Sequence, residues 1–280
     1  MSERADPLAL HAPLAARLFL GLLERRMARA FSALRVSGAF GQTGAAGDFA
    51  ESTAGRPLVV YCNHPAWWDV GVLAAVARRM APGRRLFAPF DAAALGRYGF
   101  LVRCGAFGVD PGSAGGARRL LEVGGRVLGD PGSLLCITPE GAFTDPRVRP
   151  VVLKRGLATL LARTPGTVAV PVAIEYPFWT ESRPEALVRV GRPVALPAGD
   201  AADADAWQSC LTARLEATMD ALAADAVARD PARFRTLIDG SAGVGGVYDA
   251  WRRLRAAAAG RRFDARHGAA DPVARDPAPP

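Results

Sequence analysis

Short apolar runs rich in β-branched residues alternate along the chain with segments whose apolar residues recur at helical spacing. The short runs predict strands, and the segments between them predict helices of about 10 to 15 residues. The predicted strands are Pro57–Cys62, Arg84–Phe90, Phe107–Val109, Ser133–Thr138, Thr167–Tyr176 and Leu187–Val190. Strands separated by helices of this length favour an α/β domain, in which helices flank a sheet.

Helical periodicity extends beyond the predicted sheet into N- and C-terminal helical extensions. The predicted helices are Leu8–Phe31, Val70–Met80, Asp91–Tyr98, Ala114–Leu128, Val151–Arg163, Asp203–Arg229 and Tyr248–Arg262. The small residues of Gly38–Gly55 predict a loop, and Pro171 indicates an edge or a bulge in its strand. We therefore expect four regions: an N-terminal amphipathic helix and loop, an α/β core, C-terminal helices and a disordered tail. Their ranges are 1–54, 55–200, 201–262 and 263–280.

The first predicted helix, Leu8–Phe31, is amphipathic. Its uninterrupted apolar part, Leu18–Leu23, is far shorter than the ~20 residues that span a bilayer. One interpretation places the helix on a membrane surface with its arginines near lipid phosphates, and the other packs it on the domain. These arginines are Arg17, Arg25, Arg26 and Arg29. Likewise, Tyr248–Arg262 is either a second basic helix on the membrane or a solvated surface helix.

The segment Asn63–Asp69, which follows the first predicted strand, carries the best candidate for general-base chemistry. Pro65 bends the chain between His64 and Asp69, so the two side chains can face each other although they lie five residues apart. A carboxylate beside a histidine fixes its tautomer and stabilises the imidazolium, as a base that deprotonates a hydroxyl requires. The alternative is that His64 is a polar strand-end residue and Asp69 a helix cap.

Glu140 follows another predicted strand, Ser133–Thr138, in the same way. Because sites in such sheets form at the carboxyl ends of the strands, we expect the His64 and Glu140 loops to lie at one edge. As a functional residue, Glu140 bonds to acceptor hydroxyls or holds the loop around the base; as a structural residue, it caps a turn before Gly141.

Composition narrows the classes of partner. Half of the 280 residues are hydrophobic, 22% are charged and the net charge is +8, which indicates a folded, basic protein with anionic partners. Nucleic acid is not among the expected partners, because the arginines are dispersed and aromatic residues do not interleave with them. The four cysteines form no Cys-x-x-Cys pair, which favours buried thiols in a reducing compartment over disulfides or a metal site.

Four motifs follow one another in order along the chain. They are Asn63-His64-Pro65 with Asp69, then Gly105–Asp110, then Thr138-Pro139-Glu140-Gly141, then Val170-Pro171-Val172. The ordered set, which covers roughly residues 55–195, resembles the glycerolipid acyltransferase family, which includes bacterial 1-acylglycerol-3-phosphate acyltransferases. Lys154-Arg155-Gly156 is also similar to the basic segment that follows the family's Pro-Glu-Gly motif.

The resemblance implies an enzyme of phospholipid biosynthesis with a glycerolipid-acyltransferase-like sheet. It would transfer a fatty acyl group from acyl-CoA or acyl carrier protein to a lipid hydroxyl, with no cofactor, no metal and no covalent enzyme nucleophile. His64 would be the base and Asp69 its partner. The residues implied in substrate binding are Asn63, Asp110, Pro139, Glu140, Gly141 and Lys154. We expect peripheral or monotopic contact with the cytoplasmic face of a membrane.

Two departures from the family pattern concern the acceptor. The family places an arginine after the aspartate of the second block and another after Pro-Glu-Gly-Thr, where this chain has Pro111 and Phe143. Those arginines are thought to bind the acceptor's phosphate, because a guanidinium fork suits that group. The cations left as substitutes are Arg103, Arg118, Arg147, Arg149 and Lys154. A lipid alcohol without a phosphomonoester is therefore a serious alternative acceptor.

A second function remains open at the level of the sequence. The same fold could serve a thioester hydrolase, or a non-catalytic relative that binds lipid or acyl carrier protein. The intact pair of His64 and Asp69 argues against a non-catalytic protein.

Overall fold

An eight-stranded sheet organises the protein in a computed structural model that describes residues 6–40, 45–196, 203–240, 251, 254–258 and 260. Its strands are β1 (Ala33–Gly38), β2 (Leu58–Cys62), β3 (Arg85–Asp91), β4 (Ala106–Val109), β5 (Ser133–Ile137), β6 (Val168–Glu175), β7 (Glu185–Val190) and β8 (Arg235–Asp239). Their order across the sheet is β4-β3-β5-β2-β6-β7-β1-β8. The first five in this order run parallel, so their carboxyl ends meet at one edge.

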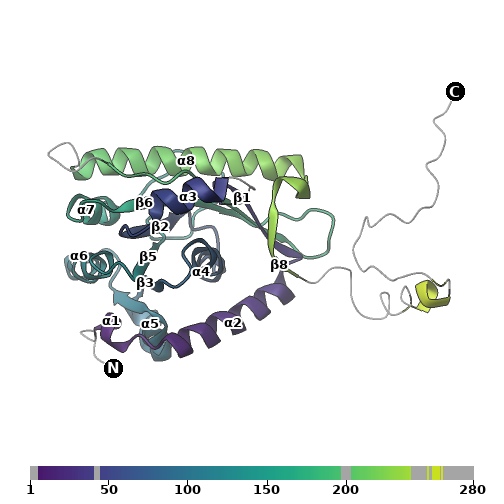
Figure 1. Cartoon of the computed structure of the whole chain (residues 1–280), viewed down its shortest axis with the longest axis horizontal. Coiled ribbons are helices and arrows are strands. Elements are labelled where there is room, and N and C mark those ends of the chain that lie inside the picture. Colours follow the sequence, from purple (N-terminus) through teal and green to yellow (C-terminus); the bar gives the residue numbers. More distant parts are fainter. Residues whose placement is uncertain are drawn as a thin grey trace.

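Helices cover both faces of the sheet (Figure 1), which confirms the predicted α/β class. They are α1 (Pro7–Leu10), α2 (Pro13–Ala30), α3 (Ala45–Thr53), α4 (Asp69–Met80), α5 (Ala92–Arg97), α6 (Ala114–Leu128), α7 (Gly156–Ala162) and α8 (Ala204–Ala228). Two 3-10 helices, η1 (Gly99–Cys104) and η2 (Pro231–Arg233), complete the described elements.

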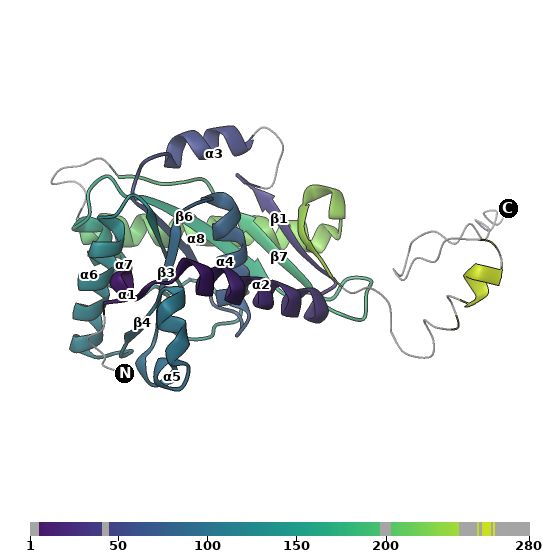
Figure 2. The same ribbon diagram turned by 60° about the horizontal axis from the view of Figure 1, so that its bottom comes forward.

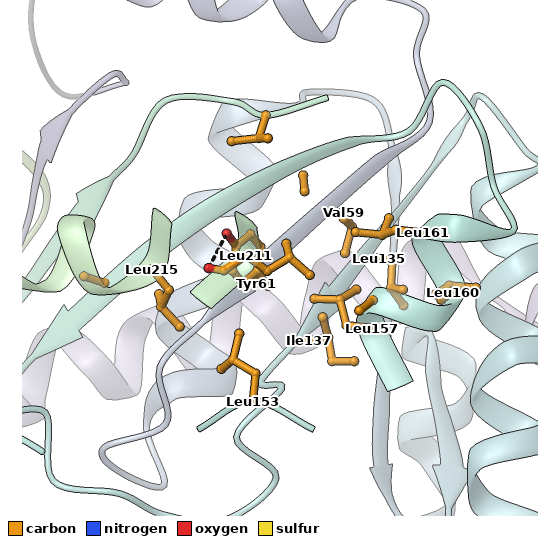
Figure 3. Packing of buried hydrophobic residues seen from close by; sticks show 14 of the residues in the cluster. Val59, Tyr61, Leu135, Ile137, Leu153, Leu157, Leu160, Leu161, Leu211 and Leu215 are labelled. Carbon is orange, nitrogen blue, oxygen red and sulfur yellow. Dashed lines mark hydrogen bonds between the residues drawn. The ribbon is translucent and has the colours of Figure 1, made fainter. Parts of the chain in front are cut away.

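On one face, α6, α7 and α8 close over the sheet (Figure 1). The side chains of β2 that point to this face are Val59 and Tyr61, and both are fully buried. They pack among leucines of α7 and α8 (Figure 3), and the Tyr61 hydroxyl donates a hydrogen bond to the Leu211 carbonyl at 3.1 Å. The side of α8 that faces this core consists of Trp207, Leu211, Leu215, Met219 and Leu222, which are all buried.

On the other face, α4 packs directly on the strands and α2 runs beside it (Figure 2). Leu58, Val60 and Cys62 are the β2 side chains that point to this side. The two helices are tied by Glu24 of α2, whose carboxylate accepts hydrogen bonds at 2.8 Å from Arg78 and Arg79 of α4. The helix α2 therefore has a fixed position on the domain.

The structure extends the sheet at one edge, beyond β7, with two strands where none was expected. β1 pairs in parallel with β7, and β8 pairs with β1 in antiparallel fashion. The strand β1 could not be predicted from its own residues, because its polar side chains have partners that are distant in sequence. Arg35 binds Glu185, and Ser37 donates to Asp225. The loop predicted over Gly38–Gly55 is also wrong for residues 45–53, which form α3 and bury Phe49.

Prolines account for two further differences. The helix predicted over Leu8–Phe31 is split into α1 and α2, because Pro13 starts a new helix after the extended residue Ala12. Pro171 does not mark an edge, since β6 lies between β2 and β7. Its carbonyl accepts from the Gly191 amide, just past the end of the β6–β7 ladder. Its missing N–H thus faces a gap in the pairing.

The predicted helix Val151–Arg163 begins later than expected, at Gly156. Val151 and Leu153 are buried while Val152 and Lys154 are exposed, so the segment before α7 is extended and buries alternate side chains. Lys154 therefore lies on an extended segment and not on a helix.

The predicted disordered tail, 263–280, lies outside the described residues. Of the predicted helix Tyr248–Arg262, the structure describes residues 251, 254–258 and 260, and residues 251 and 254–258 are helical. Within the described part of the chain, no helix combines the length and the hydropathy that a bilayer crossing requires.

Candidate active site

His64 and Asp69 lie together at the carboxyl edge of the sheet, as the spacing predicts. β2 ends at Cys62, the chain bends at Pro65, and Asp69 is the first residue of α4. The Nδ1 atom of His64 is 2.8 Å from the Asp69 carboxylate, which is completely buried. Because an ionised carboxylate can only accept hydrogen bonds, Nδ1 carries the proton and Nε2 is left as the basic nitrogen.

The Asp69 carboxylate is held by two further donors. The Ala66 amide donates to the oxygen that faces His64, at 2.9 Å. The hydroxyl of Tyr176 donates to the other oxygen at 2.6 Å. Sequence reasoning missed Tyr176, which follows β6. The signal was present, because Val172 and Ile174 share a face of the strand and Tyr176 continues their alternation toward α4.

Asn63 joins the ends of two neighbouring strands. Its side-chain amide donates to the Ile174 carbonyl at 3.0 Å, and its side-chain oxygen accepts from the Ile174 amide at 2.8 Å. The side chain is buried, with 1% of its surface exposed. Asn63 thus extends the pairing of β2 with β6 by one step and places His64 just beyond the sheet.

Glu140 holds the next loop against the His64 loop. Its carboxylate accepts a hydrogen bond from the His64 main-chain amide, and the Thr144 amide donates to the His64 carbonyl at 3.0 Å. Burial raises the pKa of Glu140 above its ordinary value, and the hydrogen bond from His64 opposes that rise. Phe143 lies over the base, with its ring centre 4.5 Å from that of His64. The loop predicted around the base is therefore present.

The other residues of the predicted Pro-Glu-Gly site, Pro139 and Gly141, contact the extended segment before α7. The Pro139 carbonyl accepts from the Lys154 amide at 2.9 Å. Gly141 has a φ of +68°, and a Cβ atom on it would lie 2.7 Å from Cε of Lys154. The positive φ favours glycine there, and the end of the Lys154 side chain crosses directly over it. Lys154 thus lies in direct contact with this loop.

The structure does not bring Asp110 to the base. It lies exposed at the end of β4, where its carbonyl accepts from Ser113 at the start of α6. β4 is three strands from β2, which corresponds to about 14 Å at the usual strand spacing. Arg118 lies on the same α6, while Arg103 lies in η1.

The two arginines that follow Phe143 already have acidic partners. Arg147 makes a two-pronged contact with Asp145, with bonds of 2.9 and 2.6 Å, and Arg149 binds Asp220 of α8 at 2.7 Å. The loop around His64 therefore presents an apolar ring and neutralised cations where the family pattern has an arginine.

The cysteines nearest to the site are poor nucleophiles. Cys62 and Cys136 are buried, and burial raises the pKa of the Cys136 thiol to about 12 and that of Cys62 well above its ordinary value. The Asp69 charge raises the pKa of Cys62 further. Because the thiolate is the reactive form, neither side chain competes with His64 for the chemistry.

A pocket of about 270 Å³ lies between α2 and the sheet. Its walls are the inner side of α2, the outward side of α4 and the strands β3 and β5, and its lining is mainly apolar. Leu20 and Leu23 line it from α2, Ala74 from α4, and Cys136 and Ile137 from β5, together with Thr138 just after that strand. Thr138 directly precedes the Pro139–Gly141 loop, so one end of the pocket reaches the edge where His64 lies.

Residues 48–175 match the model of a protein family described as Acyltransferase. A comparison with curated proteins finds no match. The matched span runs from α3 to the end of β6 and includes His64, Asp69 and Glu140. The sheet flanked by helices is consistent with an acyltransferase-domain fold. The match therefore supports the glycerolipid acyltransferase resemblance and an acyl transfer function for this domain.

Proposed function

We propose that the protein is an O-acyltransferase that moves a fatty acyl group from acyl-CoA or acyl carrier protein to a lipid hydroxyl. The observation that carries the proposal is the pair of His64 and Asp69, placed at the sheet edge beside an apolar pocket. A base with a fixed tautomer and a site for an alkyl chain are the two requirements of this reaction.

In the proposed reaction, Nε2 of His64 takes the proton of the acceptor hydroxyl as its oxygen attacks the thioester carbonyl. The buried Asp69 carboxylate stabilises the imidazolium that forms. The tetrahedral intermediate then collapses, the carbon–sulfur bond breaks, and the imidazolium returns its proton to the thiolate. The products are an ester and a free thiol, and no bond to the enzyme forms.

The pocket between α2 and the sheet is the proposed site of the acyl chain. Its lining is mainly apolar, and it opens near Thr138, beside the loop that contacts His64. An alkyl chain that enters there leaves its carbonyl carbon at the edge. Burial of the chain contributes roughly 0.8 kcal/mol for each methylene group, which favours long-chain donors.

The surroundings of His64 favour an acceptor without a phosphomonoester. Phe143 covers the base, and Arg147 and Arg149 each bind an aspartate. Of the five substitute cations suggested by the sequence, only Lys154 lies against the Pro139–Gly141 loop. One flexible ammonium is a weaker phosphate site than a pair of guanidinium forks. A neutral or amine-bearing lipid alcohol fits this arrangement better.

The outer side of α2 is the proposed membrane contact. Leu14, Leu18 and Leu22 lie four residues apart on that side and are each more than 60% exposed. Arg25 and Arg29 continue the same stripe, and within the described part of the chain neither forms an ion pair with an acid. An anionic lipid surface fits an apolar stripe that ends in arginines. We propose peripheral contact of this kind.

The first test is acyl transfer from labelled palmitoyl-CoA into a total lipid extract, with mass spectrometry of the product. We expect His64→Ala to lower the rate by about 10²- to 10⁴-fold, the usual contribution of a general base, with an unchanged unfolding midpoint. Leu211→Ala is the matched control, because it damages the core and leaves the dyad intact. Turnover at the wild-type rate in His64→Ala would overturn the mechanism.

The product decides between the acceptors and between the functions. Label in phosphatidate would mean that Lys154 or another cation serves the phosphate, whereas label in another lipid ester would support the acceptor proposed above. Release of free fatty acid without an ester product would identify a thioester hydrolase.

A further inference from the structure

We propose that Tyr176 is a positioning residue of the catalytic pair, so that the working unit is a Tyr176–Asp69–His64 chain of hydrogen bonds. The inference rests on the proposed function for its catalytic consequence. The chain itself is a matter of geometry, with successive bonds of 2.6 and 2.8 Å through the two oxygens of one carboxylate.

Tyr176 holds its hydroxyl on Asp69 from a rigid position. It directly follows β6, and the neighbouring Ile174 is fastened to Asn63 at the end of β2. Its ring stacks on that of Phe31, at 5.4 Å and an angle of 21°. Phe31 is buried where α2 ends, and it also makes an edge contact with Trp68. Three elements therefore fix the ring.

The chemical role of Tyr176 follows from the burial of Asp69. A fully buried carboxylate requires donors for both oxygens, and Tyr176 supplies the donor for the oxygen that His64 and Ala66 leave unused. Burial and the Asp69 charge raise the pKa of Tyr176 well above its ordinary value, so the hydroxyl remains a donor. By sharing the carboxylate's charge, Tyr176 keeps the His64 imidazole from binding its proton too tightly.

Other ionisable groups also face the pair. Glu140 lies on the loop after β5 and interacts with both His64 and Asp69, and Arg149 offsets part of the Glu140 charge. Cys62 at the end of β2 interacts with Asp69 but remains a neutral thiol. Tyr176 differs from all of these, because it alone among them donates a hydrogen bond directly to the Asp69 carboxylate.

The test is the pair of variants Tyr176→Phe and Tyr61→Phe. Phenylalanine at 176 keeps the stack on Phe31 and removes only the hydroxyl. Tyr61 is the matched control, because its buried hydroxyl donates to a carbonyl of α8, on the opposite face of the sheet from Asp69. Both variants lose one hydrogen bond of a tyrosine hydroxyl, but only the first touches the pair.

Two measurements separate positioning from a purely structural role. The first is an NMR titration of the histidine ring nitrogens in the resting protein, with His64→Ala used to assign the signal. The second is the pH profile of kcat/KM with palmitoyl-CoA and total lipid extract. In Tyr176→Phe we expect the His64 pKa to rise by about one unit, because Asp69 loses a charge-assisted hydrogen bond. The acidic limb of the kcat/KM profile should move to higher pH by the same amount.

The outcomes are distinct from those of the proposed function. An unchanged His64 titration in Tyr176→Phe, or an equal shift in Tyr61→Phe, would overturn the role of Tyr176. A shift in the titration together with full activity in His64→Ala would leave the hydrogen-bond chain standing and reject the base. A shifted titration and a shifted profile support both.

Discussion

The two faces of the sheet are built from the same strands and serve different ends. On the α8 face, Tyr61 and its neighbours are enclosed by leucines, and the buried Tyr61 hydroxyl is bonded to α8. On the α2 face, α4 packs closely but α2 stands off far enough to leave a pocket. The difference places the stabilising core on one side and the space for a ligand on the other, with His64 at the edge between them.

The largest effect expected on stability is therefore on the α8 face. Leu215→Ala removes a fully buried side chain from that core and should lower the free energy of unfolding by about 2 to 5 kcal/mol. The catalytic rate per folded molecule should stay at the wild-type level. Urea unfolding and a rate corrected for the folded fraction measure the two quantities. A lost rate in fully folded protein would contradict the division between the faces.

A filled pocket should change the choice of donor on the α2 face. Ala74→Phe projects a ring into the pocket, so long acyl chains lose about 0.8 kcal/mol for each methylene group that no longer fits. We expect kcat/KM to fall for long donors and to be kept for short ones. Ala213→Phe, on the exposed side of α8, is the control. Equal losses for all chain lengths would show that the pocket does not hold the chain.

The outer leucines of α2 should affect membrane binding alone. Leu18→Ser should weaken partition into vesicles of anionic phospholipid by about 10- to 100-fold, because full burial of a leucine contributes about 1.5 to 3 kcal/mol. Activity toward a soluble short-chain thioester should not change. Val227→Ser is the control, since Val227 is 82% exposed at the end of α8. A similar loss of vesicle binding in both variants would remove α2 as the contact.

The smallest effect concerns Glu175, at the end of β6. Burial raises its pKa, which means that ionisation is less favourable in the folded protein than in the unfolded chain. The wild type therefore loses stability as the pH rises from the ordinary carboxyl range through the raised pKa. Because solvent screens this half-buried carboxyl, Glu175→Gln should be more stable than the wild type by no more than about 0.5 kcal/mol at high pH, and equally stable below about pH 4. Urea unfolding of both proteins at high pH and at low pH measures this difference. A stability difference that does not depend on pH would show that the raised pKa of Glu175 is not its cause.

The sequence could predict the catalytic edge because the signals there are local. Each apolar run became a strand within a few residues, and Pro65 accounts for the bend that lets His64 meet Asp69. The same local reasoning failed where polar side chains depend on distant partners. In β1, Arg35 binds Glu185 and Ser37 binds Asp225, and no residue near the strand in sequence indicates these partners.

Tyr176 and Asp110 show the same limit from opposite directions. Tyr176 lies more than a hundred residues from Asp69 in the sequence, and only the order of the strands brings its hydroxyl to the carboxylate. Asp110 belongs to a predicted motif, but the order of the strands puts it three positions from β2. Strand order depends on how the whole chain packs, so local periodicity could not supply it.

The two-sided build of α2 bears on how such a protein can diverge. The exposed leucines of this 18-residue helix are Leu14, Leu18 and Leu22, whereas the leucines that line the pocket are Leu20 and Leu23. Mutations that alter the proposed affinity for a lipid surface therefore fall on other positions than mutations that alter the fit of an acyl chain in the pocket. Natural selection can act on adhesion and on selectivity independently, within one helix and without disturbing the core behind it.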